Sequence, residues 1–216
     1  RKLRLDSMMV KNIFATWNKG KVNEIREILK DSSVTVLTMK EAGYDIDVDE
    51  NGSTYEENAS LKAKAVMEAS GLITLADDSG LEIDFLNKEP GIHSARFMGH
   101  ETSYDVKNKC ILEKLAGVPD EKRSARFVCA IAVAFPDGRI ETVRDTMEGR
   151  IAHEIAGENG FGFDPIFFLP DRGLTSAEIS PEEKNEISHR GKALRRMCER
   201  LKELGATNTN FVNPHG

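Results

Sequence analysis

The chain has few cysteines, a single tryptophan and no long apolar run. Its three cysteines, Cys110, Cys129 and Cys198, are scattered without the spacing of a metal site. They indicate reduced thiols in a cytoplasmic protein, because disulfides form mainly in oxidising compartments. No apolar segment reaches the roughly 18 residues that a membrane-spanning helix needs, so we expect no membrane association. No apolar segment follows the charged residues 1–6, so we also expect no signal peptide.

An excess of positive charge is also missing. The 30 basic residues are outnumbered by 36 acidic ones, which gives a formal net charge of −6. Without a broad basic stripe, general nucleic-acid binding is not expected. The 216 residues, of which 39% are apolar, are enough for a substantial core in one domain or in two lobes that share a sheet.

The order of apolar patterns predicts a mixed α/β sheet with flanking helices. We expect strands over residues 10–15, 34–38, 72–76, 81–85, 125–135 and 139–144, and helices over about 19–29, 55–70, 104–115 and 189–204. Asn18 is a predicted N-cap, and Thr54 with Glu57 fits a capping box. Pro136-Asp137-Gly138 predicts a hairpin.

Two predicted helices begin with cations. Asn18-Lys19-Gly20-Lys21 opens one, and Ser188-His189-Arg190-Gly191-Lys192 opens the last. Lys or Arg is locally unfavourable at a helix N-terminus, which carries partial positive charge and unpaired N–H groups. A bound anion at that end would make the cations favourable instead. The pattern therefore indicates a phosphate-rich ligand. At the first helix start, which lacks the nucleotide P-loop pattern, solvated surface lysines are the alternative.

Carboxylates occur in two places between these helix starts. Asp77-Asp78-Ser79-Gly80 is expected to end a strand, where only one of the two aspartates would face a site. Such a carboxylate can bind Mg²⁺ or take a proton from an attacking water. The acidic loop with Asp45, Asp47, Asp49 and Glu50 offers a second metal carboxylate. Both segments also fit plain acidic turns in contact with solvent.

Aromatic and basic residues gather near the end of the chain. Phe161 and Phe163 flank glycines beside Asp164, and such rings stack on nucleobases while an aspartate pairs with a base N–H. Two core phenylalanines on a tight turn are the alternative. Lys184 and the segment Ser188–Arg190 supply hydrogen-bond donors. Trp17 is either a packing residue or one that flanks a ligand.

Taken together and in order, these motifs resemble the inosine triphosphate pyrophosphatase family, which hydrolyses non-canonical purine nucleoside triphosphates. The resemblance extends from about Val10 to Leu204. It rests on Thr16, Asn18, Lys21 and Glu24, on Glu57-Asn58-Ala59 with Lys62, on Ala76–Leu81, on Pro90-Gly91 with Ser94-Ala95-Arg96, on Gly160–Pro165 and on Ser188–Arg190. It implies an elongated α/β fold with two lobes around a central substrate cleft, and a homodimer. We then expect residues 9–205 to form a single catalytic domain of two lobes, residues 1–8 a leader and residues 206–216 a disordered tail.

The resemblance also implies a role for each site residue. The triphosphate would contact Thr16, Trp17, Asn18, Lys19, Gly20, Lys21 and Lys62. Asp78 would be the general base and a Mg²⁺ ligand, with Ser79 touching substrate and either Asp49 or Glu50 as the second metal carboxylate. The purine would be held by Phe161, Gly162, Phe163, Asp164, Lys184, His189 and Arg190. Trp17 departs from the family, which usually has a small residue there, and Phe163 replaces a more frequent tyrosine.

The implied reaction is attack of water on the α-phosphorus, which releases pyrophosphate and a nucleoside monophosphate. Lys184, His189 or Arg190 would donate a hydrogen bond to the 6-oxo group of a purine such as that of ITP, dITP or XTP. The 6-amino group of adenine is itself a donor, so it would be disfavoured there. A non-catalytic nucleotide sensor is the main alternative. A single-strand nucleic-acid binder is disfavoured by the net charge, and no Nudix box is present.

Overall fold

The computed structural model describes residues 12–205, and the predicted leader and tail lie outside them. The eight strands in this part of the chain are β1 (Asn12–Phe14), β2 (Val36–Thr38), β3 (Thr74–Ile83), β4 (Glu89–Pro90), β5 (Ser124–Ala134), β6 (Ile140–Ile151), β7 (Phe167–Leu169) and β8 (Leu174–Thr175). They form one sheet in the order β2-β1-β3-β5-β6-β7-β8, and β4 pairs with β3. β1 is parallel to β2 and β3, whereas β4, β7 and β8 pair antiparallel, so the predicted mixed sheet is confirmed.

The helices begin at capping residues that are visible in the sequence. They are α1 (Lys19–Leu29), α2 (Met39–Ala42), α3 (Tyr55–Ser70), α4 (Tyr104–Lys114), α5 (Pro181–Ile187) and α6 (His189–Glu203), with 3-10 turns η3 (Asp84–Leu86), η4 (Gly91–Arg96), η5 (Asp120–Lys122) and η6 (Asp164–Ile166). The Asn18 side chain accepts a hydrogen bond from the backbone of Lys21 at 3.1 Å, which confirms this N-cap. Among the described residues, no helix is long and apolar enough to cross a membrane.

The capping box predicted at α3 forms only in part. Thr54 accepts from the Glu57 backbone N–H at 3.0 Å, as expected. The Glu57 carboxylate, however, accepts from the backbone N–H of Ser53 at 2.8 Å, and so reaches one residue further back than a capping box requires. The complete box lies instead at α2, a short helix that the sequence analysis did not expect, where Thr38 and Glu41 bond reciprocally.

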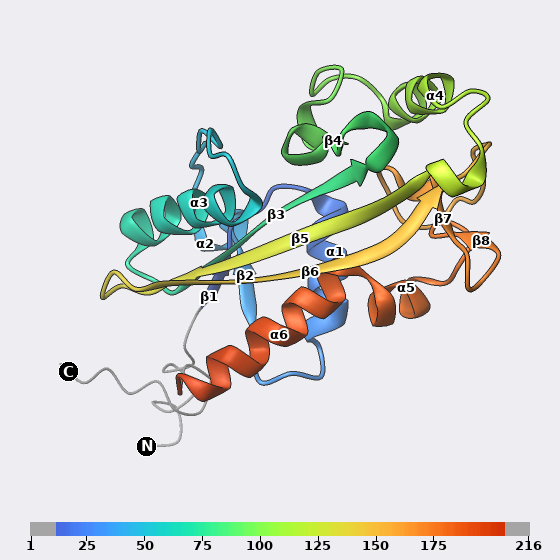
Figure 1. Cartoon of the computed structure of the whole chain (residues 1–216). Coiled ribbons are helices and arrows are strands. Elements are labelled where there is room, and N and C mark those ends of the chain that lie inside the picture. Colours follow the sequence, from blue (N-terminus) through green and yellow to red (C-terminus); the bar gives the residue numbers. More distant parts are fainter. Residues whose placement is uncertain (1–11, 206–216) are drawn as a thin grey trace. The chain divides into compact units, whose positions relative to one another are not determined.

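The described chain divides into two compact units. Of the described residues, the first holds 12–77, 130–143 and 193–205. Within it, α3 covers one face of the sheet, while α1 and α6 lie on the opposite face (Figure 1). The core under α3 is rich in alanine: Ala59 and Ala63 of the helix share one cluster with Ala15, directly after β1, and with Ala76, Ala132 and Ala134 of β3 and β5. Small residues let the helix backbone approach the sheet closely.

The second unit holds residues 78–129 and 144–192. Its core combines aliphatic residues of β3 and α4 with Phe127, Phe163 and Phe167. Arg123 is 2% exposed, yet its guanidinium donates to four carbonyl oxygens, those of Leu115, Val118, Ile151 and Ala152. These bonds satisfy the buried charge and tie α4 to the end of β6.

Two strand predictions are corrected by the structure. The Asp77–Gly80 segment does not end a strand, because β3 runs without a break from Thr74 to Ile83. The segment 139–144 is only the first half of β6, which continues to Ile151. At Asp77–Gly80, local turn-forming composition is overridden by pairing with neighbouring strands.

Candidate active site

The first cationic helix start lies at the end of β1. Phe14 and Ala15 are buried in the core, and the chain then turns through Thr16 into α1. The Thr16 hydroxyl accepts from the backbone N–H of Asn18 at 3.2 Å, which fixes the turn. The first turn of α1 contains no acidic residue, so Lys19 and Lys21 stand there without a local counter-charge.

Lys21 finds its partner on the neighbouring strand. Its ammonium lies 3.1 Å from the carboxylate of Asp77, whose side chain is fully buried. A buried carboxylate is costly unless a cation or hydrogen-bond donors accompany it. Asp77 therefore fixes Lys21 beside the turn.

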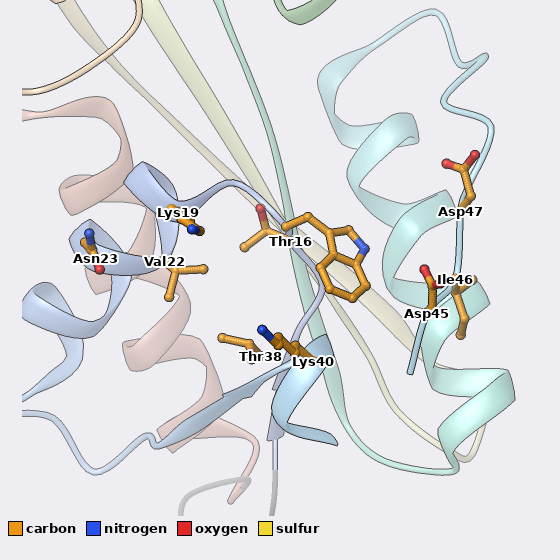
Figure 2. Close-up of a pocket in the computed structure, with 10 residues that line it drawn as sticks. Thr16, Lys19, Val22, Asn23, Thr38, Lys40, Asp45, Ile46 and Asp47 are labelled. Atoms are coloured by element: carbon orange, nitrogen blue, oxygen red, sulfur yellow. The ribbon is translucent and has the colours of Figure 1, made fainter. Parts of the chain in front are cut away.

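Residues of the same turn line a pocket of about 910 Å³ (Figure 2). Its walls are formed by Thr16, Trp17, Lys19, Val22, Asn23, Thr38, Lys40, Asp45, Ile46 and Asp47. Trp17 is 51% exposed, so this indole is not a packing residue, and it faces the pocket instead. Asn18, Gly20 and Lys21 are not among the lining residues.

The end of the acidic loop lies against α3. Lys62, from the second turn of that helix, is 2.8 Å from the Glu50 carboxylate, whereas Asp49 is exposed. Within residues 12–205, no group of three or more His, Cys, Asp or Glu side chains is arranged to hold a metal ion. This donor set still fits Mg²⁺, which commonly takes only one or two carboxylates and completes its shell with water and substrate phosphates.

Asp78 and Ser79 follow in β3 and belong to the second unit. Successive side chains of a strand point to opposite faces, so Asp78 faces away from the buried Asp77 and is partly exposed. The Ser79 hydroxyl accepts from the Arg190 guanidinium at 3.1 Å. Arg190 is only 2% exposed, and this bond links the second cationic helix start to β3.

The start of α6 is fixed by its backbone and by an aromatic contact. The Ser188 hydroxyl caps the helix by accepting from the Gly191 backbone N–H at 2.9 Å. A Cβ at Gly191 would overlap the carbonyl oxygen of Asn185, so only glycine fits there. The His189 ring stacks on Phe127 with centroids 4.8 Å apart and an interplanar angle of 16°. The stack holds the imidazole in a defined plane.

Asp164 is the centre of a buried polar cluster. Its carboxylate accepts from the Lys184 ammonium at 2.5 Å, from the Ser176 hydroxyl at 2.7 Å and from the Phe161 backbone N–H at 3.0 Å. Asp164 is 1% exposed and Lys184 is 4% exposed. The carboxylate therefore positions Lys184 and closes the glycine loop. Ser176 was not expected from the sequence, because it belongs to no recognisable motif.

The two loop phenylalanines differ. Phe163 is 5% exposed, belongs to the core and meets Tyr104 edge-on with centroids 5.0 Å apart. This matches the core alternative. Phe161 is half-buried, and the Lys184 ammonium lies 4.8 Å from its ring centroid. Phe161 is therefore the more accessible ring of the loop and can stack on a base, whereas Phe163 belongs to the core.

Helix α4 supports the glycine loop. The buried Asn108 side chain donates to the Gly162 carbonyl at 3.2 Å. One residue before it, the Lys107 ammonium donates to the Ala95 carbonyl at 3.2 Å and lies over the Tyr104 ring. Burial lowers the pKa of Lys107 and raises the pKa of Tyr104. These supports were missed because helical spacing alone does not reveal a tertiary partner.

Comparison with known proteins adds an independent line of evidence. The model of the Ham1 family matches residues 12–200. A dITP/XTP pyrophosphatase of Desulforamulus reducens is 47% identical over 195 residues, which are 90% of this chain and 97% of that protein. A dITP/XTP pyrophosphatase of Bacillus subtilis is 44% identical over 194 residues, covering 90% of this chain and 98% of that protein.

Solved structures agree with the sequence matches. A HAM1 protein from Coxiella burnetii superposes with a TM-score of 0.81 at 40% identity, covering 90% of this chain and 100% of that one. The Ham1 protein of Staphylococcus aureus gives a TM-score of 0.80 at 41% identity, with 90% and 99% coverage. These matches confirm the resemblance drawn from the motifs. Because they extend over nearly all of the described residues, in sequence and in fold alike, the chain belongs to the Ham1 family.

Proposed function

We propose that this chain hydrolyses non-canonical purine nucleoside triphosphates, namely ITP, dITP and XTP, to the monophosphate and pyrophosphate, and so cleanses the nucleotide pool. The relatives named dITP/XTP pyrophosphatase support the activity. The choice of Asp78 as the catalytic carboxylate rests on one observation: Asp77 and Asp78 are consecutive residues of the continuous strand β3. Asp77 is fully buried with Lys21, and the next residue, Asp78, is the carboxylate of the pair that solvent reaches.

Asp78 acts in this proposal as the general base. A carboxylate that takes a proton from water needs access to that water, which a fully buried side chain lacks. Lys21 and Lys62 bind the triphosphate as point charges, and each is already positioned by a carboxylate, Asp77 or Glu50. Oriented cations stabilise the charge that develops on the transferring and leaving phosphates.

Magnesium is part of the proposal. Asp78 with Asp49 or Glu50 would hold the ion, which neutralises polyphosphate charge and lowers the pKa of a bound water. Glu50 already lies 2.8 Å from the Lys62 ammonium, so a cation there would share this carboxylate with lysine. The preference for Mg²⁺ is tested by isothermal titration of the metal into protein with and without a non-hydrolysable triphosphate.

Selectivity is proposed to come from obligate donors around the base. Arg190 and Lys184 have no acceptor capacity, and both are almost completely buried. A 6-oxo group accepts from such donors, whereas a 6-amino group meets them donor to donor. A mismatch of this kind leaves buried polar groups unpaired, which discriminates strongly. Phe161 is proposed to stack on the base.

The test is a panel of nucleoside triphosphates with Mg²⁺, in which pyrophosphate is detected separately from orthophosphate. We expect pyrophosphate from ITP, dITP and XTP and little from ATP. Asp78→Asn should lower turnover by about three orders of magnitude, because general-base catalysis contributes roughly 10²–10⁴-fold. Asp171→Asn, at an exposed position, is the matched control. Nucleotide binding without pyrophosphate release would instead identify a non-catalytic sensor.

We further propose a homodimer and a cytoplasmic location. Within residues 12–205, Cys110, Cys129 and Cys198 form no disulfide, which supports a reducing compartment. Light scattering coupled to gel filtration measures the oligomeric state, and cell fractionation measures the location. A monomer at micromolar concentration, or a periplasmic protein, would contradict the respective proposal.

A further inference from the structure

The pocket beside the phosphate turn contains charged side chains that the protein does not neutralise. Lys19 and Lys40 line it together with Asp45 and Asp47, and all four are exposed. Within residues 12–205, none of the four forms an ion pair, although their neighbours do: Lys21 pairs with Asp77 and Lys62 with Glu50. Two cations and two anions thus border one cavity without pairing to each other.

The charges stand on opposite walls. Figure 2 shows Lys19, Val22 and Asn23 on α1 at one side, Asp45 and Asp47 at the other, and Thr38 with Lys40 between them. Ile46 packs against the core cluster beneath α3, whereas Asp45 and Asp47 on either side of it are exposed. The half-exposed indole of Trp17 supplies a large flat apolar surface in the same cavity.

We propose that this pocket is a second ligand site, which takes a purine nucleotide with an exocyclic amino group. An aromatic base stacks on Trp17, an interaction worth about 1–3 kcal/mol per base. Phosphate is matched by the two lysines. Aspartate is an acceptor only, so Asp45 and Asp47 require donors, which the N–H and amino groups of a guanine edge provide side by side. The volume of about 910 Å³ is within the range of small-molecule sites.

This site differs from the one proposed for catalysis in its base-recognition chemistry. The catalytic site offers donors to a 6-oxo purine, whereas this pocket offers acceptors. Lys40, Asp45 and Asp47 have no role in the proposed reaction, so the second site does not depend on that reaction.

One consequence does rest on the proposed function. This pocket shares Thr16, Trp17 and Lys19 with the turn proposed to bind triphosphate. Two phosphate groups that share one lysine repel each other, so each ligand should weaken binding of the other by the same factor. The amino-bearing nucleotide would then inhibit hydrolysis of dITP.

The experiment uses GMP, which has no anhydride bond to hydrolyse. Trp17, the single tryptophan of the chain, lines this pocket, and the Lys40→Ala and Asp45→Asn variants below separate its emission change from binding at the triphosphate turn. Titration calorimetry detects binding independently. We expect saturable binding of GMP with a change in Trp17 emission, and about tenfold weaker binding of IMP, which lacks the amino group. Lys40→Ala and Asp45→Asn should each weaken GMP binding by about tenfold, the effect of one charge-assisted hydrogen bond. Lys64→Ala, on the exposed side of α3, is the matched control and should change nothing.

In the same samples, Lys40→Ala should relieve inhibition by GMP while leaving dITP turnover without GMP unchanged. The proposal is overturned if GMP shows no saturable binding at millimolar concentration, if IMP binds equally well, or if Lys40→Ala and Asp45→Asn bind GMP as the unaltered protein does. Absence of pyrophosphate release from dITP, with GMP binding intact, would contradict only the proposed function.

Discussion

Replacing Asp164 by asparagine tests whether the proposed base-binding region depends on a buried ion pair. The substitution preserves the shape of the side chain and one acceptor oxygen, but it removes the negative charge beside Lys184. Both residues are almost completely buried, with their charged atoms 2.5 Å apart. Asp164→Asn therefore leaves an ammonium in a poorly solvated place without its carboxylate.

The expected cost follows from this burial. Removing one partner of a buried ion pair destabilises proteins by about 3–5 kcal/mol. The asparagine oxygen can still accept from Ser176 or Phe161, so we expect the lower end, about 3 kcal/mol. Lys184→Met should cost a similar amount, because it leaves the carboxylate uncompensated. The double variant contains neither charge, so its loss should be at least about 2 kcal/mol smaller than the sum of the single losses.

The assay is equilibrium unfolding in urea, followed by far-UV circular dichroism, for the four proteins of this double-mutant cycle. Asp171→Asn, at an exposed position, serves as the control and should stay within about 0.5 kcal/mol of the unaltered protein. Additive losses, or single losses below about 1 kcal/mol, would refute the reasoning that the pair is buried and mutually dependent.

Three further predictions concern the surroundings of the site. Gly160→Ala should lower the free energy of unfolding, measured by thermal melts, by about 2–3 kcal/mol, because φ is +71° and the new Cβ would overlap the buried Asp164 carboxylate. Gly138→Ala is the control: its φ is +95° but the space around it is open, so it should cost about 1 kcal/mol. Asn108→Ala should raise KM for dITP more than it lowers kcat, since it releases the glycine loop rather than a reacting group. A lower kcat with an unchanged KM would contradict this role. The Arg126 guanidinium lowers the pKa of Asp84, so Asp84 stabilises the fold above pH 3.8 and loses this effect as pH falls through the lowered pKa; Asp84→Asn should therefore cost up to about 1 kcal/mol at pH 7 and less at pH 3.

Much of the local structure could be predicted because single residues determine it. The Asn18 and Thr54 side chains accept from backbone N–H groups three residues on, so their effect needs no distant partner. The same logic would have found α2, because Thr38-x-x-Glu41 is a capping-box pattern. It was missed because a helix of four residues shows no hydrophobic period.

The errors occur where a distant partner overrides local preference. Asp77-Asp78-Ser79-Gly80 is typical of a turn, but Lys21 from another element accompanies the buried Asp77, and β3 continues. Arg123 is similar: an arginine at this position is ordinarily solvent-exposed, and only the fold brings four carbonyl oxygens around it. The partners of Asp164 likewise come from two segments that the sequence does not connect.

The cationic helix starts now differ in what balances each charge. Lys21 pairs with Asp77, Arg190 donates to Ser79, and Lys192 lies 3.5 Å from Asp145, so the protein itself supplies acceptors for three of these cations. Their presence at a helix N-terminus therefore does not by itself require a bound anion. Lys19 is different, since within residues 12–205 no carboxylate lies within ion-pair distance of it. Lys19 is therefore the lysine of these helix starts at which the helix dipole still favours a bound anion, and it borders both the proposed triphosphate site and the second pocket.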